Sequence, residues 1–207
     1  IYRNVYSGLV SEEYAGKEVK VAGWINSIRK LGGLTFVTLR DETGIVQIIT
    51  EDASLFEGIT RESTVSITGE VRLRTEDMIN KNMKTGKIEI LAKSVEVLGE
   101  CLNVLPFQIN RSTEEASEET RLKYRYLDLR NKKVHDNMVF RFKVIDHIRS
   151  LMKSMDFTEI STPIITTSSP EGARDFIIPS RRYKGKFYAL PQAPQIYKQL
   201  LMVSGFN

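Results

Sequence analysis

Cysteine, histidine and long apolar runs are scarce in this sequence, and each shortage argues against a class of protein. The one cysteine, Cys101, has no partner within the chain for a disulfide, which favours a reducing compartment and a cytoplasmic location. His135 and His147 are the only histidines, so we expect no Cys/His metal site and no bound metal. No apolar run approaches the length of about 20 residues that spans a bilayer, and the start lacks the apolar core of a signal peptide, so we expect no membrane partner.

The composition is that of an ordinary water-soluble globular chain. Its 207 residues suffice for one large or two small domains, and 41% are hydrophobic while 27% are charged. The formal net charge of +4 is compatible with a nucleic-acid partner. Many basic proteins bind no nucleic acid, so the charge alone does not decide the function.

The first hundred residues are predicted to form a small β-barrel. Short segments with strand-like alternation cover residues 17–30, 33–41, 44–50, 63–74 and 86–99. The second and third segments meet at "DETG", which is a tight hairpin signal, and "EDASLFEGI" offers one or two helical turns after the third. This order matches a Greek-key barrel of the OB type.

Alternation along two of these strands places a candidate base-binding pair on the outer face. If Val37, Leu39, Val46 and Ile48 fill the barrel, Phe36 and Gln47 point outward together. An exposed ring supplies a stacking platform for a single-stranded base, and an amide recognises a base edge. The alternative is that Phe36 belongs to the core and Gln47 is a solvated polar residue. Arg29, Arg72 and Arg74 are candidates for phosphate contacts or solvated strand residues.

The middle of the chain has the composition of a hinge. Residues 104–130 begin with a polar, acidic stretch, and "TRLKYRYLDLRNKK" at 120–133, where arginines and lysines surround two tyrosines, overlaps their end. A solvated helix beside a domain junction and a nucleic-acid contact both fit this basic segment.

The second half is predicted to be an α+β segment. "DNMVFRFKVIDHIRSLMKSMDF" has apolar residues at helical spacing, with Asp136 or Asn137 as its cap. "TEISTPIIT" is predicted to be a strand with Pro163 at its edge, and "DFIIPS" and "KFYALP" to be two more strands around a basic turn. The last helix ends at Gly205.

The second half also carries a candidate site for an amino acid. Gln195 and Lys198 are three positions apart on the last predicted helix, so they share a face that suits a carboxylate ligand. Glu171, in the loop "SPEGARD", can accept the ammonium of the same ligand when the loop closes, with Arg174 and Asp175 at its base. The alternatives are an amphipathic helix with a polar outer face and a solvated loop charge.

Several long stretches in a fixed order resemble the N-terminal part of the bacterial type of aspartyl-tRNA synthetase, a class II family. They are "GWINSIRKLGGLTF", "LRDETGIVQ", "EETRLKYRYLDLR", "EISTPIIT", "SSPEGARDFIIPSR" and "KGKFYALPQAPQIYKQLLMVSGF". The resemblance implies an OB-fold β-barrel at 1–103 that binds the anticodon and a hinge at 104–130. It also implies a fragment of the antiparallel-sheet catalytic domain at 131–207, holding motif 1, the flipping loop and the amino-acid-binding helix.

The resemblance also implies roles for individual residues and partners. Phe36 would stack on an anticodon base, Gln47 would recognise it, and Arg29 and Glu89 would contact the anticodon. Glu171, Gln195 and Lys198 would bind aspartate, and the helix and strand of motif 1 would form a homodimer. The full-length enzyme would use ATP and Mg²⁺ to charge tRNA with aspartate. No part of this chain matches the second and third class II motifs, so we expect no catalytic residues, no bound cofactor and no activity from these 207 residues alone.

Overall fold

The structure is a computed structural model of all 207 residues, described here for residues 1–102, 104–110, 116–168, 174–190 and 192–207. The chain divides into two compact units, Ile1–Leu105 and Pro106–Asn207.

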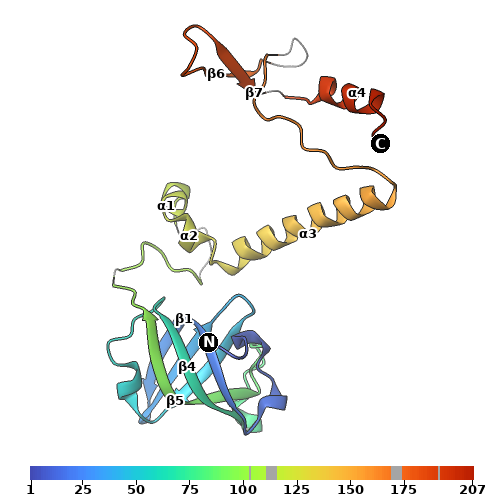
Figure 1. Ribbon diagram of the computed structural model, residues 1–207. Helices are drawn as coiled ribbons and strands as arrows, with labels where there is room; N and C mark the ends of the chain where they lie inside the picture. Colours follow the sequence, from blue (N-terminus) through green and yellow to red (C-terminus); the bar gives the residue numbers. More distant parts are fainter. Residues whose placement is uncertain (103, 111–115, 169–173, 191) are drawn as a thin grey trace. The chain divides into compact units, whose positions relative to one another are not determined.

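The first unit is a closed five-stranded barrel, as the sequence predicts (Figure 1). Its strands lie in the order β1-β2-β3-β5-β4, and β3 pairs with β5 in parallel while the other neighbours are antiparallel. The strands are β1 (Glu18–Leu31), β2 (Leu34–Arg40), β3 (Ile45–Thr50), β4 (Thr64–Leu73) and β5 (Ile88–Gly99). The short 3₁₀ helices are η1 (Ser7–Leu9), η2 (Glu12–Tyr14), η3 (Ala53–Phe56) and η4 (Glu76–Met78).

Alternate residues of each strand fill the barrel. In β2 and β3 the core residues are Val37, Leu39, Val46 and Ile48, all fully buried, as strand alternation predicts. Branched aliphatic side chains from the other strands complete the core: Val21, Ile25, Val65, Ile67, Val71, Ile88 and Ile90. The opposite faces of β2 and β3 therefore lie on the outside of the barrel.

Polar groups fix one end of β2. The Arg40 guanidinium donates from Nη2 to both carboxylate oxygens of Glu62, at 2.7 and 2.9 Å, and these side chains are only 10% and 5% exposed. Asp41 opens the predicted hairpin turn, where its N–H donates to the Gly44 carbonyl. The Asp41 carboxylate also accepts from the Ser7 N–H at 2.6 Å, which ties η1 to the β2–β3 turn.

The second unit begins with short helices α1 (Glu118–Lys123) and α2 (Arg125–Asp128), within the segment predicted as a hinge. The buried Asp128 carboxylate forms ion pairs with Arg121 and Arg125. Two of the cations in the basic segment thus neutralise an internal charge, which favours the structural interpretation of that segment over a nucleic-acid contact.

Helix α3 (Lys132–Ser154) starts earlier than predicted, and the predicted caps at Asp136 and Asn137 are wrong. Asn131 is the N-cap because its side-chain oxygen accepts the Lys133 N–H at 3.0 Å. Its amide nitrogen also donates to the Ile109 carbonyl at 2.7 Å, which fixes the helix start to the preceding segment.

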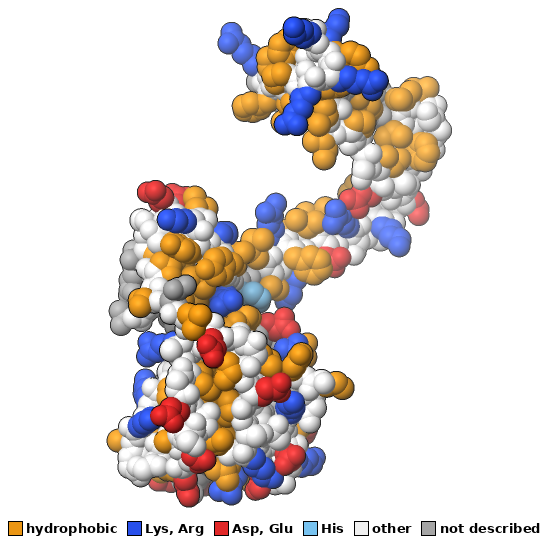
Figure 2. Space-filling model, turned by 60° about the vertical axis from the view of Figure 1, so that its left-hand side comes forward, with side chains coloured by type: hydrophobic (Ala, Val, Ile, Leu, Met, Phe, Trp, Pro, Cys, Tyr) orange, Lys and Arg blue, Asp and Glu red, His pale blue; other side chains and the backbone are white. Residues whose placement is uncertain are grey.

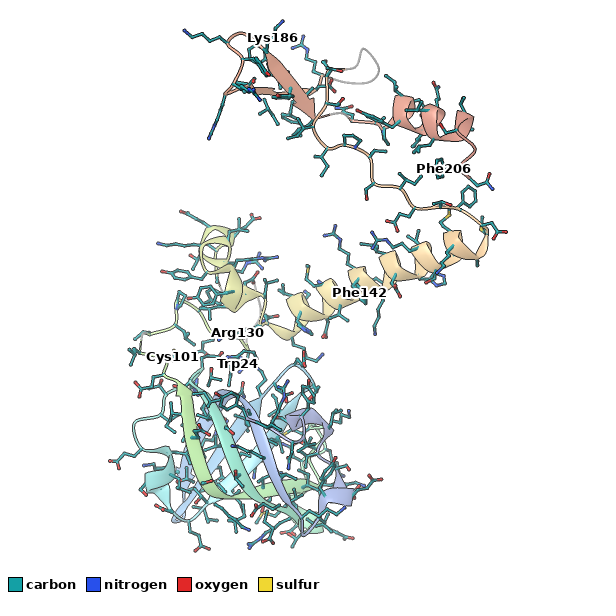
Figure 3. All side chains as sticks on the ribbon, viewed as in Figure 1. Trp24, Cys101, Arg130, Phe142, Lys186 and Phe206 are labelled. Carbon is teal, nitrogen blue, oxygen red and sulfur yellow. The ribbon has the colours of Figure 1, made fainter. Side chains whose placement is uncertain are left out.

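The apolar residues of α3 are not buried within this chain. Phe142 is 65% exposed and Ile148 is 52% exposed, and no residue of the helix is buried (Figure 3). The space-filling view shows hydrophobic side chains along this helix at the surface (Figure 2).

The end of the chain forms a β-hairpin and a helix. β6 (Phe176–Pro179) pairs antiparallel with β7 (Phe187–Leu190), and α4 (Gln195–Val203) stops before Gly205, whose φ is 87°. The strand predicted at 158–166 is wrong, because only Thr166 has a β-partner, in an isolated bridge to Ala189. A strand needs a hydrogen-bonded neighbour along its length, and Pro163 offers no N–H to one.

Candidate nucleic-acid interface

Four adjacent strands bring Arg29, Phe36, Gln47 and Glu89 onto one outer face of the barrel. Arg29 of β1 lies opposite Phe36 of β2. Phe36 lies opposite Ile49 of β3, and Gln47 lies opposite Thr38, so Phe36 and Gln47 are diagonal neighbours. The strand order thus joins side chains from the first, second, third and fifth strands into one continuous surface.

The outward direction of Phe36 and Gln47 is confirmed. Both are half-buried, whereas their neighbours Val37, Val46 and Ile48 are fully buried. Phe36 is therefore outside the core and keeps part of its ring accessible. The exposed Arg29 beside it supplies a cation at the rim of the same surface.

Gln47 and Glu89 are already in contact. The Gln47 amide nitrogen donates to Glu89 Oε2 at 3.2 Å. This bond orients both side chains across the β3–β5 pairing, where Ile48 lies beside Ile90. The surface thus offers a ring for stacking, an amide that both donates and accepts, and a carboxylate that only accepts.

A third polar residue lies behind this pair. Arg74 Nε is 3.4 Å from Glu89 Oε2, and the Arg74 side chain is only 5% exposed. Its Nη1 donates to the Met78 carbonyl at 3.5 Å. Neither expectation for Arg74, a phosphate contact or a solvated strand residue, fits a side chain that is this little exposed. Arg72, with a side chain that is 51% exposed, stays available.

Burial changes the pKa of Arg74. Desolvation lowers the pKa of its guanidinium, and the negative charge of Glu89 opposes that shift. Strand alternation alone does not identify this residue as buried, because Arg74 follows the last residue of β4 and its contacts are with Glu89 and the Met78 carbonyl. The polar loop at 75–86 gives no sequence signal for this burial.

The predicted aspartate residues are only partly placed by the structure. Gln195 and Lys198 lie on one face of α4, and both are exposed. Glu171 lies outside the described residues. On either side of that loop, the Ser168 hydroxyl donates to Asp175 Oδ2 at 2.9 Å, which joins the two flanks.

A hollow of about 680 Å³ lies elsewhere in the second unit. Its lining comes from the end of α3 and from Phe157, Thr158 and Glu159. The residues that line it include neither Gln195 nor Lys198. This hollow is therefore separate from the predicted aspartate residues.

Comparison with known proteins assigns the two units to families. Residues 19–98 match the OB-fold nucleic acid binding domain family, and residues 117–207 match the class II tRNA synthetases (D, K and N). An aspartate–tRNA(Asp/Asn) ligase of Treponema denticola is 48% identical over 211 aligned positions, which cover 99% of this chain and 35% of that protein. A protein of the same name from Pelagibacter ubique is 50% identical over 210 positions, covering 100% of this chain and 35% of that protein.

The chain is thus similar to class II aspartate–tRNA(Asp/Asn) ligases. It spans about a third of the length of the curated relatives that it matches.

Solved structures of the family share the fold. The asparaginyl-tRNA synthetase of Pyrococcus horikoshii with asparaginyl-adenylate aligns with a TM-score of 0.80 and 29% identity, covering 98% of this chain and 45% of that one. A putative aspartyl-tRNA synthetase of Leishmania major aligns with a TM-score of 0.82 over 98% of this chain and 42% of that one; at 24% identity it supports the fold alone.

The described ranges lack both a metal-binding cluster and a membrane-spanning helix. No cluster of three or more His, Cys, Asp or Glu side chains there is arranged to hold a metal ion. None of the helices in those ranges is both long and apolar enough to cross a bilayer.

Proposed function

We propose that this chain is the N-terminal part of an aspartate–tRNA ligase, in which the barrel binds the anticodon. The continuous face of Arg29, Phe36, Gln47 and Glu89 carries the proposal, because it combines stacking, amide recognition and charge on one surface. The names of the relatives, all aspartate–tRNA(Asp/Asn) ligases at about half identity, support the same assignment.

On this surface each side chain has a separate task. The Phe36 ring stacks on an unpaired base, and the Gln47 amide hydrogen-bonds to its edge. The Glu89 carboxylate accepts N–H groups from a second base. Arg29 attracts the phosphate backbone without choosing a sequence. We assign this task to residues 1–103, the hinge to 104–130, and a share of the aspartate pocket to 131–207.

In the pocket, charge complementarity decides which amino acid is chosen. The Lys198 ammonium pairs with the side-chain carboxylate of aspartate, Gln195 orients the ligand, and Glu171 accepts its ammonium. The exposed face that Gln195 and Lys198 share on α4 supports this arrangement. A side-chain amide or ammonium, as in asparagine or lysine, gives no reason for a cation at this position.

The activation step itself is assigned to the part of such an enzyme that this chain does not span. The aspartate α-carboxylate attacks the α-phosphate of ATP and displaces pyrophosphate, which gives an aspartyl-adenylate. A hydroxyl of the terminal ribose of tRNA then takes the aspartyl group, and AMP leaves. The described residues do not fit a Mg²⁺ site, since no acidic cluster is present among them. We therefore expect no aspartate-dependent pyrophosphate exchange from these 207 residues. Measurable exchange would contradict the assignment of the activation step to the part of the enzyme that this chain does not span.

The exposed apolar residues of α3 support a homodimer in the complete cytoplasmic enzyme. A second copy that covers Phe142 and Ile148 would remove side chains that are 65% and 52% exposed in this chain. A monomeric complete enzyme at micromolar concentration would overturn this part of the proposal.

The binding of a hairpin RNA with the anticodon loop of an aspartate tRNA tests the anticodon role. We expect tighter binding than to a hairpin with the same stem and a scrambled loop. Equal affinity for both hairpins would leave only a non-specific RNA-binding module.

An asparagine-specific ligase is the second candidate, because the Pyrococcus horikoshii asparaginyl enzyme shares the fold at 29% identity. In the complete enzyme, Lys198→Leu is expected to abolish selectivity for aspartate over asparagine. If the variant keeps that selectivity, another residue recognises the substrate.

A further inference from the structure

The guanidinium of Arg74 is buried beside the outer face without a full set of hydrogen bonds. Its side chain is 5% exposed, and Nε lies 3.4 Å from Glu89 Oε2. Neither Nε nor Nη2 has a hydrogen-bond partner among the described residues. Buried donors are usually satisfied, so two spare N–H groups next to one carboxylate need an explanation.

Glu89 has another donor in the free protein. Gln47 Nε2 donates to the same oxygen, Oε2, at 3.2 Å. Under the proposed function, the Gln47 amide hydrogen-bonds to a base, and this contact competes with its bond to Glu89. RNA binding would then leave the Glu89 carboxylate without the donor that holds it in the free protein.

Arg74 lies where it can replace Gln47 as the hydrogen-bond donor to Glu89. Its Nε is already close to Oε2, and a small rotation of the Glu89 carboxylate lets it accept from the spare N–H groups. Although burial lowers the pKa of Arg74, an arginine stays protonated at neutral pH, so its charge persists. The bond from Nη1 to the Met78 carbonyl holds the guanidinium in place meanwhile.

We propose that Arg74 is a positioning residue for base recognition. It keeps the Glu89 carboxylate oriented when Gln47 leaves Glu89 to hydrogen-bond to RNA. This inference rests on the anticodon role of the barrel proposed above. Arg74 acts through Glu89, because its Nε and Nη2 are inaccessible to solvent and cannot be presented to RNA.

The test measures affinity for a set of hairpin RNAs in which each anticodon base is replaced in turn. Glu89→Gln identifies the base that Glu89 recognises, as the position where discrimination is lost. Arg74→Met is expected to lower discrimination at that same position by about tenfold, within the range seen for a mismatched base. Arg74→Lys, which keeps the positive charge, is expected to retain most of it.

A combined variant separates positioning from a general effect on stability. In the Glu89→Gln background, Arg74→Met is expected to cause no further loss of discrimination, since the carboxylate it holds is gone. Losses that multiply, equal losses from Met and Lys, or a loss at a different base would each overturn the inference. If the methionine variant does not fold, Arg74→Gln provides the same comparison.

Different results would refute the anticodon role of the barrel and the positioning role of Arg74. If the unmodified chain does not distinguish the aspartate hairpin from its base variants, the anticodon role fails and this inference with it. If the unmodified chain discriminates and Arg74→Met discriminates equally well, only the role of Arg74 is refuted.

Discussion

Replacing Phe36 with alanine removes the proposed stacking platform and leaves the charges of the surface unchanged. Loss of one base–aromatic stack costs about 1–3 kcal/mol, which corresponds to a rise in Kd of about 5- to 150-fold at about 1.4 kcal/mol per tenfold. Because Phe36 is half-buried and outside the core, we expect the free energy of unfolding to fall by less than the about 3–5 kcal/mol typical of a buried phenylalanine.

Fluorescence anisotropy with the aspartate hairpin RNA measures this loss across a range of salt concentrations. The slope of log Kd against log salt is expected to stay unchanged, since Phe36 carries no charge. Val97→Ala is the matched control, because it truncates an apolar side chain that is 42% exposed near the other end of β5 from Glu89. An unchanged Kd for a folded Phe36→Ala variant, or an equal loss in the control, would refute the stacking role.

Three further predictions concern charge, stability and pH. Arg29→Ala is expected to lower the salt slope by about 0.7 if it contacts one phosphate of a single strand; an unchanged slope in the anisotropy assay would rule that contact out. Glu62→Ala leaves Arg40 buried without its carboxylate partner and is expected to cost about 3–5 kcal/mol in denaturant unfolding, while a loss below about 1 kcal/mol, the size of an exposed ion pair, would contradict this. The Ser54 hydroxyl and N–H lower the pKa of Asp52, so the ionised cap of η3 persists below the usual aspartate value of about 3.9 and is lost only as pH falls through the lowered pKa. Titration by NMR measures that pKa, and Ser54→Ala is expected to raise it; the same value in both proteins would refute the cause.

Strand alternation predicted the barrel strands and left two alternatives for the outer face. The period of two places Val37 and Leu39 on one face of their strand and Phe36 on the other, and burial in the structure decides which face is the core. Once that face is known, the outward direction of Phe36 and Gln47 follows. The hairpin turn pairs the second strand with the third, and this pairing places Phe36 and Gln47 on one surface.

Features that depend on contacts between residues far apart in the sequence were not predictable from local patterns. The sequence offers Arg74, like Arg72, as a phosphate contact or a solvated strand residue, because local periodicity does not encode the path of the loop that follows. The start of α3 depends on Asn131, whose amide contacts the distant Ile109 carbonyl. Likewise, the strand expected around Pro163 has no hydrogen-bonding neighbour among the described residues except at Thr166.

Mapping of backbone amide chemical shifts on addition of the aspartate hairpin RNA tests the anticodon-binding surface most directly. The account predicts shifts centred on Arg29, Phe36, Gln47 and Glu89, across β1, β2, β3 and β5. Shifts confined to β4 or to the second unit, with these four strands unaffected, would contradict it.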